Sequence, residues 1–193
     1  MSDCGVAPLA RALTILGLTE SESRSLLVQA RQRTLVPGET LCAQGRAPTH
    51  FHLLEEGVCH GVYHTEAGRH YSKEFYWEGD WVIGFESLLE SDSLAFELQA
   101  LTPARAFALP MAILQAWRTG RHPAYLALLE TQLLFKERKE RLLLLSTPEQ
   151  RYRHFCDHYP ELLARLADYQ IAAYLGITPI SLSRIKARLR HAD

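Results

Sequence analysis

The sequence predicts an α+β protein with an antiparallel β domain first, one long connecting helix next, and a small helical domain at the C-terminus. Residues 33–110 contain short aromatic and β-branched runs that are separated by glycines. Residues 122–145 repeat apolar side chains at helical spacing, and residues 169–189 have the pattern of two short helices joined by a tight turn. The expected domains are therefore residues 1–121, 122–146 and 147–193.

The first element of the chain is predicted to be helical, with one or two helices over residues 6–31. Thr19-Glu20-Ser21-Glu22 fits a helix N-terminus that carries acidic residues in its first turn. In the β region, glycines at positions 57, 68 and 79 are 11 residues apart. Short strands at this spacing indicate an antiparallel sandwich or barrel, and Ala67-Gly68 fits a hairpin turn between two of them.

The longest predicted helix covers residues 122–145, and Pro123 suits its first turn. Leu128, Phe135 and Leu142 recur every seven residues, and Leu145 extends this apolar stripe. Such a stripe fits two arrangements. It can pack on the β domain of its own chain, or it can join two copies of the chain.

The C-terminal pattern is that of a helix-turn-helix. Ile171 and Leu175 lie on one apolar face of the first helix, and Gly176 supplies the backbone freedom that ends it. Thr178 can cap the second helix, and Pro179 suits the first position of that helix. The residues that recur at helical spacing and should face inward are Leu182, Ile185 and Leu189.

The outer face of that second helix is polar and basic. It carries Ser181, Ser183, Arg184, Lys186 and Arg188. A helix pair with an apolar seam inside and hydroxyl and cationic groups outside is suited to a DNA major groove. The alternative is a helical hairpin that packs on the β domain and binds nothing.

Charge is distributed unevenly along a chain whose net charge is −1. Residues 1–110 have a balance of −6, whereas residues 111–193 have a balance of +5, which suggests separate partners for the two halves. The cysteines, at positions 4, 42, 59 and 156, include no Cys-x-x-Cys pair. We therefore expect reduced thiols in a cytoplasmic protein, with no structural zinc or iron–sulfur site. No signal peptide and no membrane-spanning apolar run is expected either.

Several segments together carry a family resemblance. They are Pro37-Gly-Glu-Thr-Leu41, Gln44-Gly45, Leu53-Leu-Glu-Glu-Gly-Val58, Gly79-Asp80-Trp-Val-Ile-Gly84 and Ile171-Ala-Ala-Tyr-Leu-Gly-Ile-Thr-Pro-Ile-Ser-Leu-Ser-Arg-Ile185. In this order, with a long helix between, the sequence resembles the Crp/Fnr family of bacterial transcription regulators over roughly residues 15–193.

The resemblance implies an N-terminal jelly-roll of the cyclic-nucleotide-binding kind and a homodimer joined through the long helix by Leu128, Phe135, Leu142 and Leu145. The implied partner is double-stranded DNA with a pseudo-palindromic operator, whose half-sites would be roughly 34 Å apart. Further candidate partners are a small-molecule effector and RNA polymerase. No cofactor is implied.

The tentative effector pocket consists of Gly84, Phe85, Glu86, Ser87 and Ser93. At the position where cyclic-nucleotide binders of the family have an arginine, this chain has Ser93 or Leu94, with Glu90 and Asp92 nearby. Because a cyclic phosphate needs a cation or a cluster of N–H donors, we do not expect cyclic AMP as the signal. The family's oxygen sensors use clustered N-terminal cysteines, and Cys4 alone cannot hold such a cluster.

In the recognition helix, the base-reading positions of the cyclic-AMP receptor match Pro179, Ile180 and Arg184, so only the arginine is kept. We expect Arg184 to read a base, because a bidentate arginine contact to guanine discriminates by about 1–3 kcal/mol. The remaining DNA contacts are expected from Thr178, Ser181 and Ser183, and from Lys186 and Arg188 along the phosphate backbone.

Other interpretations remain open in the β domain. Histidines 50, 52, 60, 64 and 70 could hold a metal or haem, or they are ordinary exposed strand residues. The aromatic residues Phe75, Trp77, Trp81 and Phe85 either fill the core or form an aromatic effector pocket. Cys42 and Cys59 could sense oxidants if they are exposed and their pKa values are lowered.

An enzyme is not expected, since the sequence contains no Ser/His/Asp or Cys/His constellation, Walker loop or HExxH motif. Two alternatives to a regulator are considered. One is an effector-binding module whose DNA-binding domain has degenerated. The other is a barrel enzyme of the cupin kind, for which His60, His64 and Glu66 form only a poor metal set.

Overall fold

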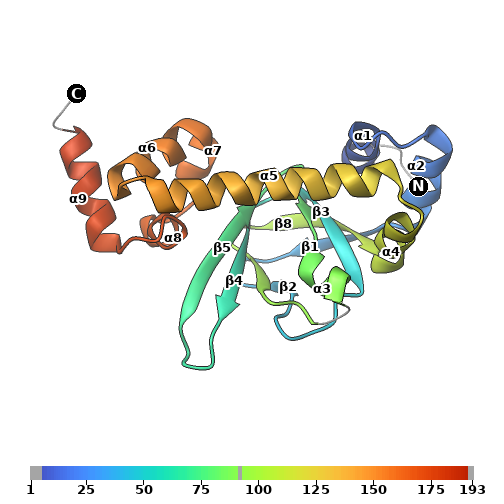
Figure 1. Cartoon of the computed structure of the whole chain (residues 1–193), viewed down its shortest axis with the longest axis horizontal. Helices are drawn as coiled ribbons and strands as arrows, with labels where there is room; N and C mark the ends of the chain where they lie inside the picture. Colours follow the sequence, from blue (N-terminus) through green and yellow to red (C-terminus); the bar gives the residue numbers. More distant parts are fainter. Residues whose placement is uncertain (1–5, 91–92, 191–193) are drawn as a thin grey trace.

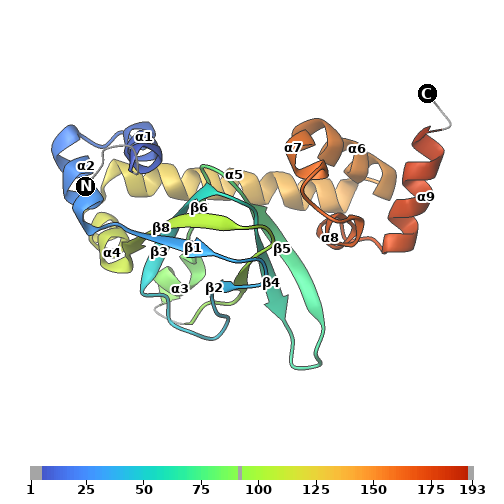
Figure 2. The ribbon, with the colours of Figure 1, turned by 180° about the vertical axis from the view of Figure 1, so that it is seen from behind.

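The computed structural model describes residues 6–90 and 93–190, so the expectations about Cys4 and Asp92 concern positions outside the described residues. A β domain lies below one long helix, which runs between the N-terminal helices at one end and the C-terminal helices at the other (Figures 1 and 2). The β domain and its flanking helices comprise α1 (Ala7–Ile15), α2 (Glu20–Gln29), β1 (Arg31–Leu35), β2 (Thr40–Cys42), β3 (His50–Glu56), β4 (Cys59–His64), β5 (His70–Tyr76), β6 (Trp81–Val82), α3 (Phe85–Glu90), β7 (Glu97–Ala100), β8 (Ala104–Pro110) and α4 (Met111–Thr119). The remaining helices are α5 (Pro123–Leu145), α6 (Pro148–His158), α7 (Pro160–Leu163), α8 (Asp168–Tyr174) and α9 (Pro179–Arg190).

The strands form two antiparallel four-stranded sheets, in the orders β1-β8-β3-β6 and β2-β7-β4-β5. Apolar side chains of both sheets, including Leu54, Leu98 and Ala106, meet between them at 0–1% exposure. The β4–β5 hairpin turns at Gly68, whose φ of 72° is accessible to glycine at little cost. The predicted antiparallel β domain and its hairpin are thus confirmed.

The N-terminal helices pack on the β domain through Leu9, Leu13 and Leu26. The helix start predicted at Thr19 is confirmed as a capping box. The Thr19 hydroxyl accepts the Glu22 N–H at 3.3 Å, and the Glu22 carboxylate accepts the Thr19 N–H at 2.7 Å. The Thr19 hydroxyl also donates to the Glu22 carboxylate at 2.6 Å, and this hydrogen bond, together with that from the Thr19 N–H, lowers the pKa of Glu22 to about 2.

The long helix α5 begins at Pro123, as predicted, with His122 Nδ1 accepting the Ala124 N–H at 3.1 Å. Its first turns are buried against the β domain through Ala124, Tyr125 and Leu128. Leu128 is only 5% exposed and belongs to the core of its own chain. The β domain and its helices already cover this side chain, so Leu128 has little surface left for a second subunit, and its expected role at a dimer interface stays a prediction. Phe135 and Leu142 are half-buried, and Leu145 is 78% exposed.

The C-terminal helices enclose a core of their own. Another capping box starts α6, because the Thr147 hydroxyl accepts the Gln150 N–H at 3.3 Å and the Gln150 amide oxygen accepts the Thr147 N–H at 2.9 Å. The fully or almost fully buried residues of this core are Phe155, Leu162, Ile171, Ala172, Leu175, Leu182 and Ile185. The predicted helix pair with its inward-facing leucine and isoleucine residues is confirmed as α8 and α9.

Candidate nucleic-acid interface

The turn between α8 and α9 orients the second helix. Gly176 has a φ of 67°, a left-handed conformation that ends α8 directly after its C-cap residue Leu175. The Thr178 hydroxyl then accepts the Ser181 N–H at 3.1 Å and caps α9, directly before Pro179. Leu182 and Ile185 anchor α9 in the domain core at 0% and 2% exposure.

The opposite side of α9 is open to solvent at the end of the molecule farthest from α1 and α2 (Figures 1 and 2). The exposed residues there are Thr178, Pro179, Ile180, Ser183, Arg184 and Arg188, whereas Ser181 and Lys186 are half-buried. All eight of the sequence-predicted DNA contacts therefore lie on or beside one helix, and none is buried.

The cationic residues of α9 differ in their partners. Lys186 donates to both Asp168 carboxylate oxygens, at 2.8 and 2.9 Å, and Arg188 pairs with Glu149 at 3.1 Å. Within residues 6–90 and 93–190, nothing forms a hydrogen bond or ion pair with the Arg184 guanidinium. Exposed ion pairs contribute about 0–1 kcal/mol, so DNA phosphates can replace Asp168 and Glu149 at little cost. Arg184 is therefore available to contact a base.

The C-terminal domain is attached to the β domain by aromatic packing. Phe75 of β5 lies 5.2 Å from Tyr174 of α8, measured between ring centroids. Trp77 lies 5.6 Å from Tyr159, with the two rings nearly perpendicular. Because Val58 and Phe75 share one buried cluster with the core of the C-terminal domain, the two domains contact through apolar as well as polar groups.

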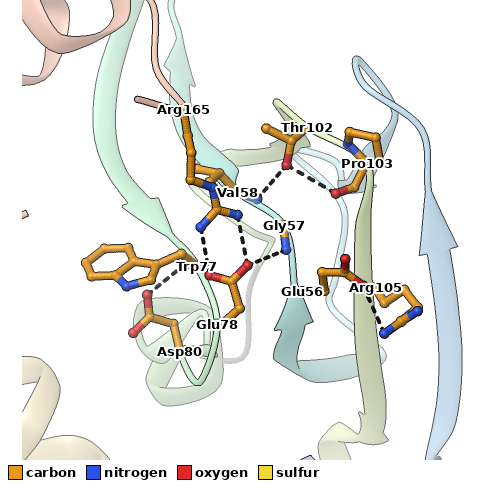
Figure 3. A network of polar contacts seen from close by, with 10 residues as sticks. All are labelled: Glu56, Gly57, Val58, Trp77, Glu78, Asp80, Thr102, Pro103, Arg105 and Arg165. Atoms are coloured by element: carbon orange, nitrogen blue, oxygen red, sulfur yellow. Dashed lines mark hydrogen bonds and ion pairs between the residues drawn. The ribbon is translucent and has the colours of Figure 1, made fainter. Parts of the chain in front are cut away.

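A polar clamp, which we define as Glu78 and Arg165, lies beside Trp77 (Figure 3). Two guanidinium nitrogens of Arg165 donate to the two Glu78 carboxylate oxygens, each at 2.8 Å. Glu78 also accepts the Gly57 N–H at 2.7 Å. The hydrogen bonds from Arg165 hold the pKa of Glu78 below its usual range. Sequence reasoning missed this clamp because its two residues are 87 positions apart and neither belongs to a motif.

The tentative effector pocket is assembled in part. Gly84, Phe85, Glu86 and Ser87 line one cavity of about 80 Å³. Pockets for drug-sized ligands measure about 300–1,000 Å³, so this cavity is too small for a nucleotide as it stands. The Leu94 side chain fills the space, since a Cβ added at Gly84 would lie 2.3 Å from Leu94 Cδ2. Ser93, the residue before Leu94 in the sequence, is half-buried.

The four aromatic residues that sequence analysis singled out line a larger cavity of about 360 Å³, together with residues of α1 and α5. Asp80 also lines this cavity and accepts the Trp77 N–H at 2.9 Å (Figure 3). Burial raises the pKa of Asp80 to about 6. Phe75 is therefore a core residue, and the four aromatic residues border a cavity. The interpretation of this cavity as an aromatic effector pocket stays a hypothesis.

Among the residues that the structure describes, no three His, Cys, Asp or Glu side chains are grouped so that they could hold a metal ion, and this includes the histidines and cysteines of the β domain. Burial lowers the pKa of His52 and of His60 to about 4. Burial also raises the pKa of Cys42 to about 11 and that of Cys59 to about 12. Both thiols are therefore poor nucleophiles, which disfavours oxidant sensing at these positions.

These features define a class of protein. Residues 32–118 match the sequence model of the cyclic nucleotide-binding domain, and the long helix α5 and the small helical domain of α6 to α9 follow them in the structure. This part of the chain is thus similar to cyclic nucleotide-binding domains, and the resemblance to Crp/Fnr-type transcription regulators is confirmed at the level of the fold. In the described part of the chain, no helix combines the length and apolar character needed to cross a bilayer.

Particular solved structures share this arrangement. A regulatory protein of Silicibacter pomeroyi DSS-3, named for suspected cAMP binding, is 27% identical, with a TM-score of 0.62 and coverage of 95% of this chain and 86% of its own. FixK2 from Bradyrhizobium japonicum is 19% identical, with a TM-score of 0.73 and coverage of 84% and 85%. The c-di-GMP-responsive regulator CLP from Xanthomonas campestris is 16% identical, with a TM-score of 0.69 and coverage of 90% and 93%. No curated protein matched the sequence.

Proposed function

We propose that the protein is a DNA-binding transcription regulator of the Crp/Fnr type that acts as a homodimer in the cytoplasm and performs no catalysis. The observation that carries this proposal is the recognition surface of α9. One face of the helix is anchored at Leu182 and Ile185. The other presents Arg184 to solvent, without a hydrogen-bond or ionic partner among residues 6–90 and 93–190. A rigid helix that projects a guanidinium between small hydroxyl side chains matches the groups that read a major groove.

The proposed roles on DNA follow from exposure and pairing. Arg184 reads a base. Pro179 and Ile180 contact the groove through apolar surface, and Ile180 is available for this contact because it is 66% exposed. Ser183 and Thr178 contact phosphates or base edges. Lys186 and Arg188 contact the phosphate backbone in place of their carboxylate partners.

The dimer is proposed to form through the C-terminal part of α5. Exposed leucines along this helix include Leu134 at 53% and Leu145 at 78%, beside the half-buried Phe135 and Leu142. A helix with this many exposed leucines is poorly solvated as a monomer, and a second copy can cover them. The twofold axis would then direct the two α9 helices to half-sites about 34 Å apart.

The proposed signal acts on the β domain and is not cyclic AMP. The cavity at Gly84 to Ser87 holds only about 80 Å³. Leu94, in the segment before β7, lies at the position where cyclic-nucleotide binders of the family have an arginine, and the cations that line the cavity are instead Lys73 of β5 and Lys136 of α5.

The test is an electrophoretic mobility shift with DNA from the protein's own upstream region at moderate salt. Arg184→Ala should weaken specific binding by about tenfold to a hundredfold, as expected for one lost bidentate contact, and leave non-specific binding in place. Arg24→Ala is the matched control, because Arg24 pairs with Glu20 on the distant helix α2. Equal affinity of the Arg184→Ala variant and the wild type would remove Arg184 from the reading role. No binding to any genomic fragment would favour the effector module with a degenerate DNA-binding domain.

A further inference from the structure

The aromatic cavity, which we define as the space of about 360 Å³ between α1, the β5–β6 segment and α5, has a lining of one charge sign. Among the described residues that line it, there are two carboxylates, Glu74 and Asp80, and no lysine, arginine or histidine. The aromatic side chains of the lining include Phe75, Trp77, Trp81, Phe85, Phe135 and Tyr159. The cavity is therefore largely apolar, and the charge that it carries is negative.

The two carboxylates of this lining differ in their partners. Glu74 pairs with the Lys73 ammonium at 2.6 Å. The Asp80 carboxylate instead accepts the Trp77 N–H at 2.9 Å (Figure 3), and the Asp80 N–H donates to the Trp77 carbonyl at 3.0 Å, which fixes the position of Asp80 in a tight turn. Within residues 6–90 and 93–190, no cationic side chain pairs with Asp80.

The negative charge of Asp80 thus lacks a counter-charge. Burial raises the pKa of Asp80 to about 6, the Trp77 N–H opposes this shift, and repulsion from Glu74 and Glu78 adds to it. Above that pH the carboxyl group is mainly ionised, and a partly buried charge is costly unless a cation balances it. The hydrogen bond from Trp77 does not require this charge, because a neutral amide oxygen accepts an N–H as well. A cation in the cavity would require it.

Two rings of the lining are held in place by aromatic residues behind them. The Trp81 ring lies 5.6 Å from the Phe51 ring, and the Phe85 ring lies 6.1 Å from the Tyr125 ring, measured between centroids. Aromatic rings attract cations to their faces, and rings that are already fixed lose little freedom when a ligand binds. An anion would meet two carboxylates and no cation in this lining, so the lining favours a ligand of positive charge.

We propose that the aromatic cavity binds an organic ammonium ion with an apolar body, with Asp80 as its counter-charge and Trp77, Trp81 and Phe85 against its apolar part. The volume of about 360 Å³ suits a small organic molecule, unlike the cavity of about 80 Å³ at Gly84. Binding itself does not depend on the proposed function, whereas a role of this ligand as the signal of the regulator does.

The direct test is a titration of the full chain with three phenyl compounds of similar size that differ in charge. They are 2-phenylethylammonium, 2-phenylethanol and phenylacetate. Two of the three tryptophans of the chain, Trp77 and Trp81, line the cavity, so tryptophan fluorescence reports binding, and calorimetry gives its stoichiometry. We expect one 2-phenylethylammonium per chain, bound about tenfold or more tighter than 2-phenylethanol, with phenylacetate the weakest of the three.

The matched variant is Asp80→Asn, which keeps an oxygen for the Trp77 N–H and removes the charge. It should bind 2-phenylethylammonium no more tightly than 2-phenylethanol. Glu20→Gln removes a carboxylate that is 81% exposed on α2, outside the cavity, and should bind all three compounds as the wild type does. Circular dichroism checks that both variants are folded, and the comparison of the three compounds on the wild type needs no variant.

Three results would overturn the proposal. The first is the lack of saturable binding of 2-phenylethylammonium up to about 10 mM. The second is equal affinity of the wild type for the ammonium compound and the alcohol, and the third is a preference for the ammonium compound that persists in Asp80→Asn. Because no DNA is present, these results and those of the mobility-shift test fail or succeed independently.

Discussion

Replacing Arg165 by glutamine removes the guanidinium of the polar clamp and leaves the Gly57 contact of Glu78 in place. The two hydrogen bonds at 2.8 Å are charge-assisted and bidentate, which favours a strong interaction. Against this, the Arg165 and Glu78 side chains are 29% and 40% exposed, so water screens the pair. We therefore expect a coupling free energy of about 1 kcal/mol, near the upper end of measured exposed pairs.

The assay is a double-mutant cycle of Arg165→Gln and Glu78→Gln, with unfolding by urea followed by tryptophan fluorescence, to which Trp77 at the domain contact contributes. The exposed pair Arg24 and Glu20, within one helix, is the control and should couple by about 0.5 kcal/mol or less. A coupling below about 0.3 kcal/mol for Arg165 and Glu78 would refute the clamp as a stabilising contact between domains.

The pH dependence of the clamp has a definite sign. The pKa of Glu78 is lower in the folded protein than in the unfolded chain, mainly because Arg165 donates hydrogen bonds to the carboxylate. The clamp therefore stabilises the fold above the unfolded pKa of this carboxyl group, and the effect is lost as the pH falls through the folded pKa. The coupling should accordingly vanish in strong acid.

Two further predictions concern α5 and the aromatic cavity. The double variant Leu134→Glu/Leu145→Glu should be monomeric in sedimentation equilibrium, because both leucines are exposed in one subunit and would face the partner. Leu89→Glu, at an exposed leucine on α3, is the control and should remain dimeric. A double variant that remains dimeric would contradict the proposed interface. Burial raises the pKa of Asp80 from its usual value of 3.8 to about 6 in the folded protein, so the wild type loses folding free energy as the pH rises from about 4 to about 6. Asp80→Asn has no carboxyl group to ionise and should therefore become more stable relative to the wild type over this range. A stability difference between the two proteins that does not change with pH would contradict this.

Local signals in the sequence were sufficient for most of the fold. Thr19 begins a helix with a capping box, and Gly176 ends α8, because caps and left-handed glycines act within a few residues of the chain. The periodic residues Leu182 and Ile185 identified the buried face of α9 for the same reason.

The parts that sequence reasoning could not find depend on contacts between distant segments. Lys73 meets Lys139 only because β5 packs against α5 and α8, and nothing near either residue signals this. Leu128 follows the same apolar period as Phe135 and Leu142. A helical period alone cannot tell which positions the β domain covers and which it leaves exposed, and Leu128 proved to be covered. The size of the cavity at Gly84 likewise depends on how Leu94 packs.

Hydroxyl-radical footprinting of the purified protein on the DNA upstream of its own gene tests the regulator assignment most directly. Two protected half-sites on one face of the duplex, one helical turn apart, are predicted for a dimer that presents two α9 helices. A uniform cleavage pattern at protein concentrations that saturate non-specific binding would contradict it.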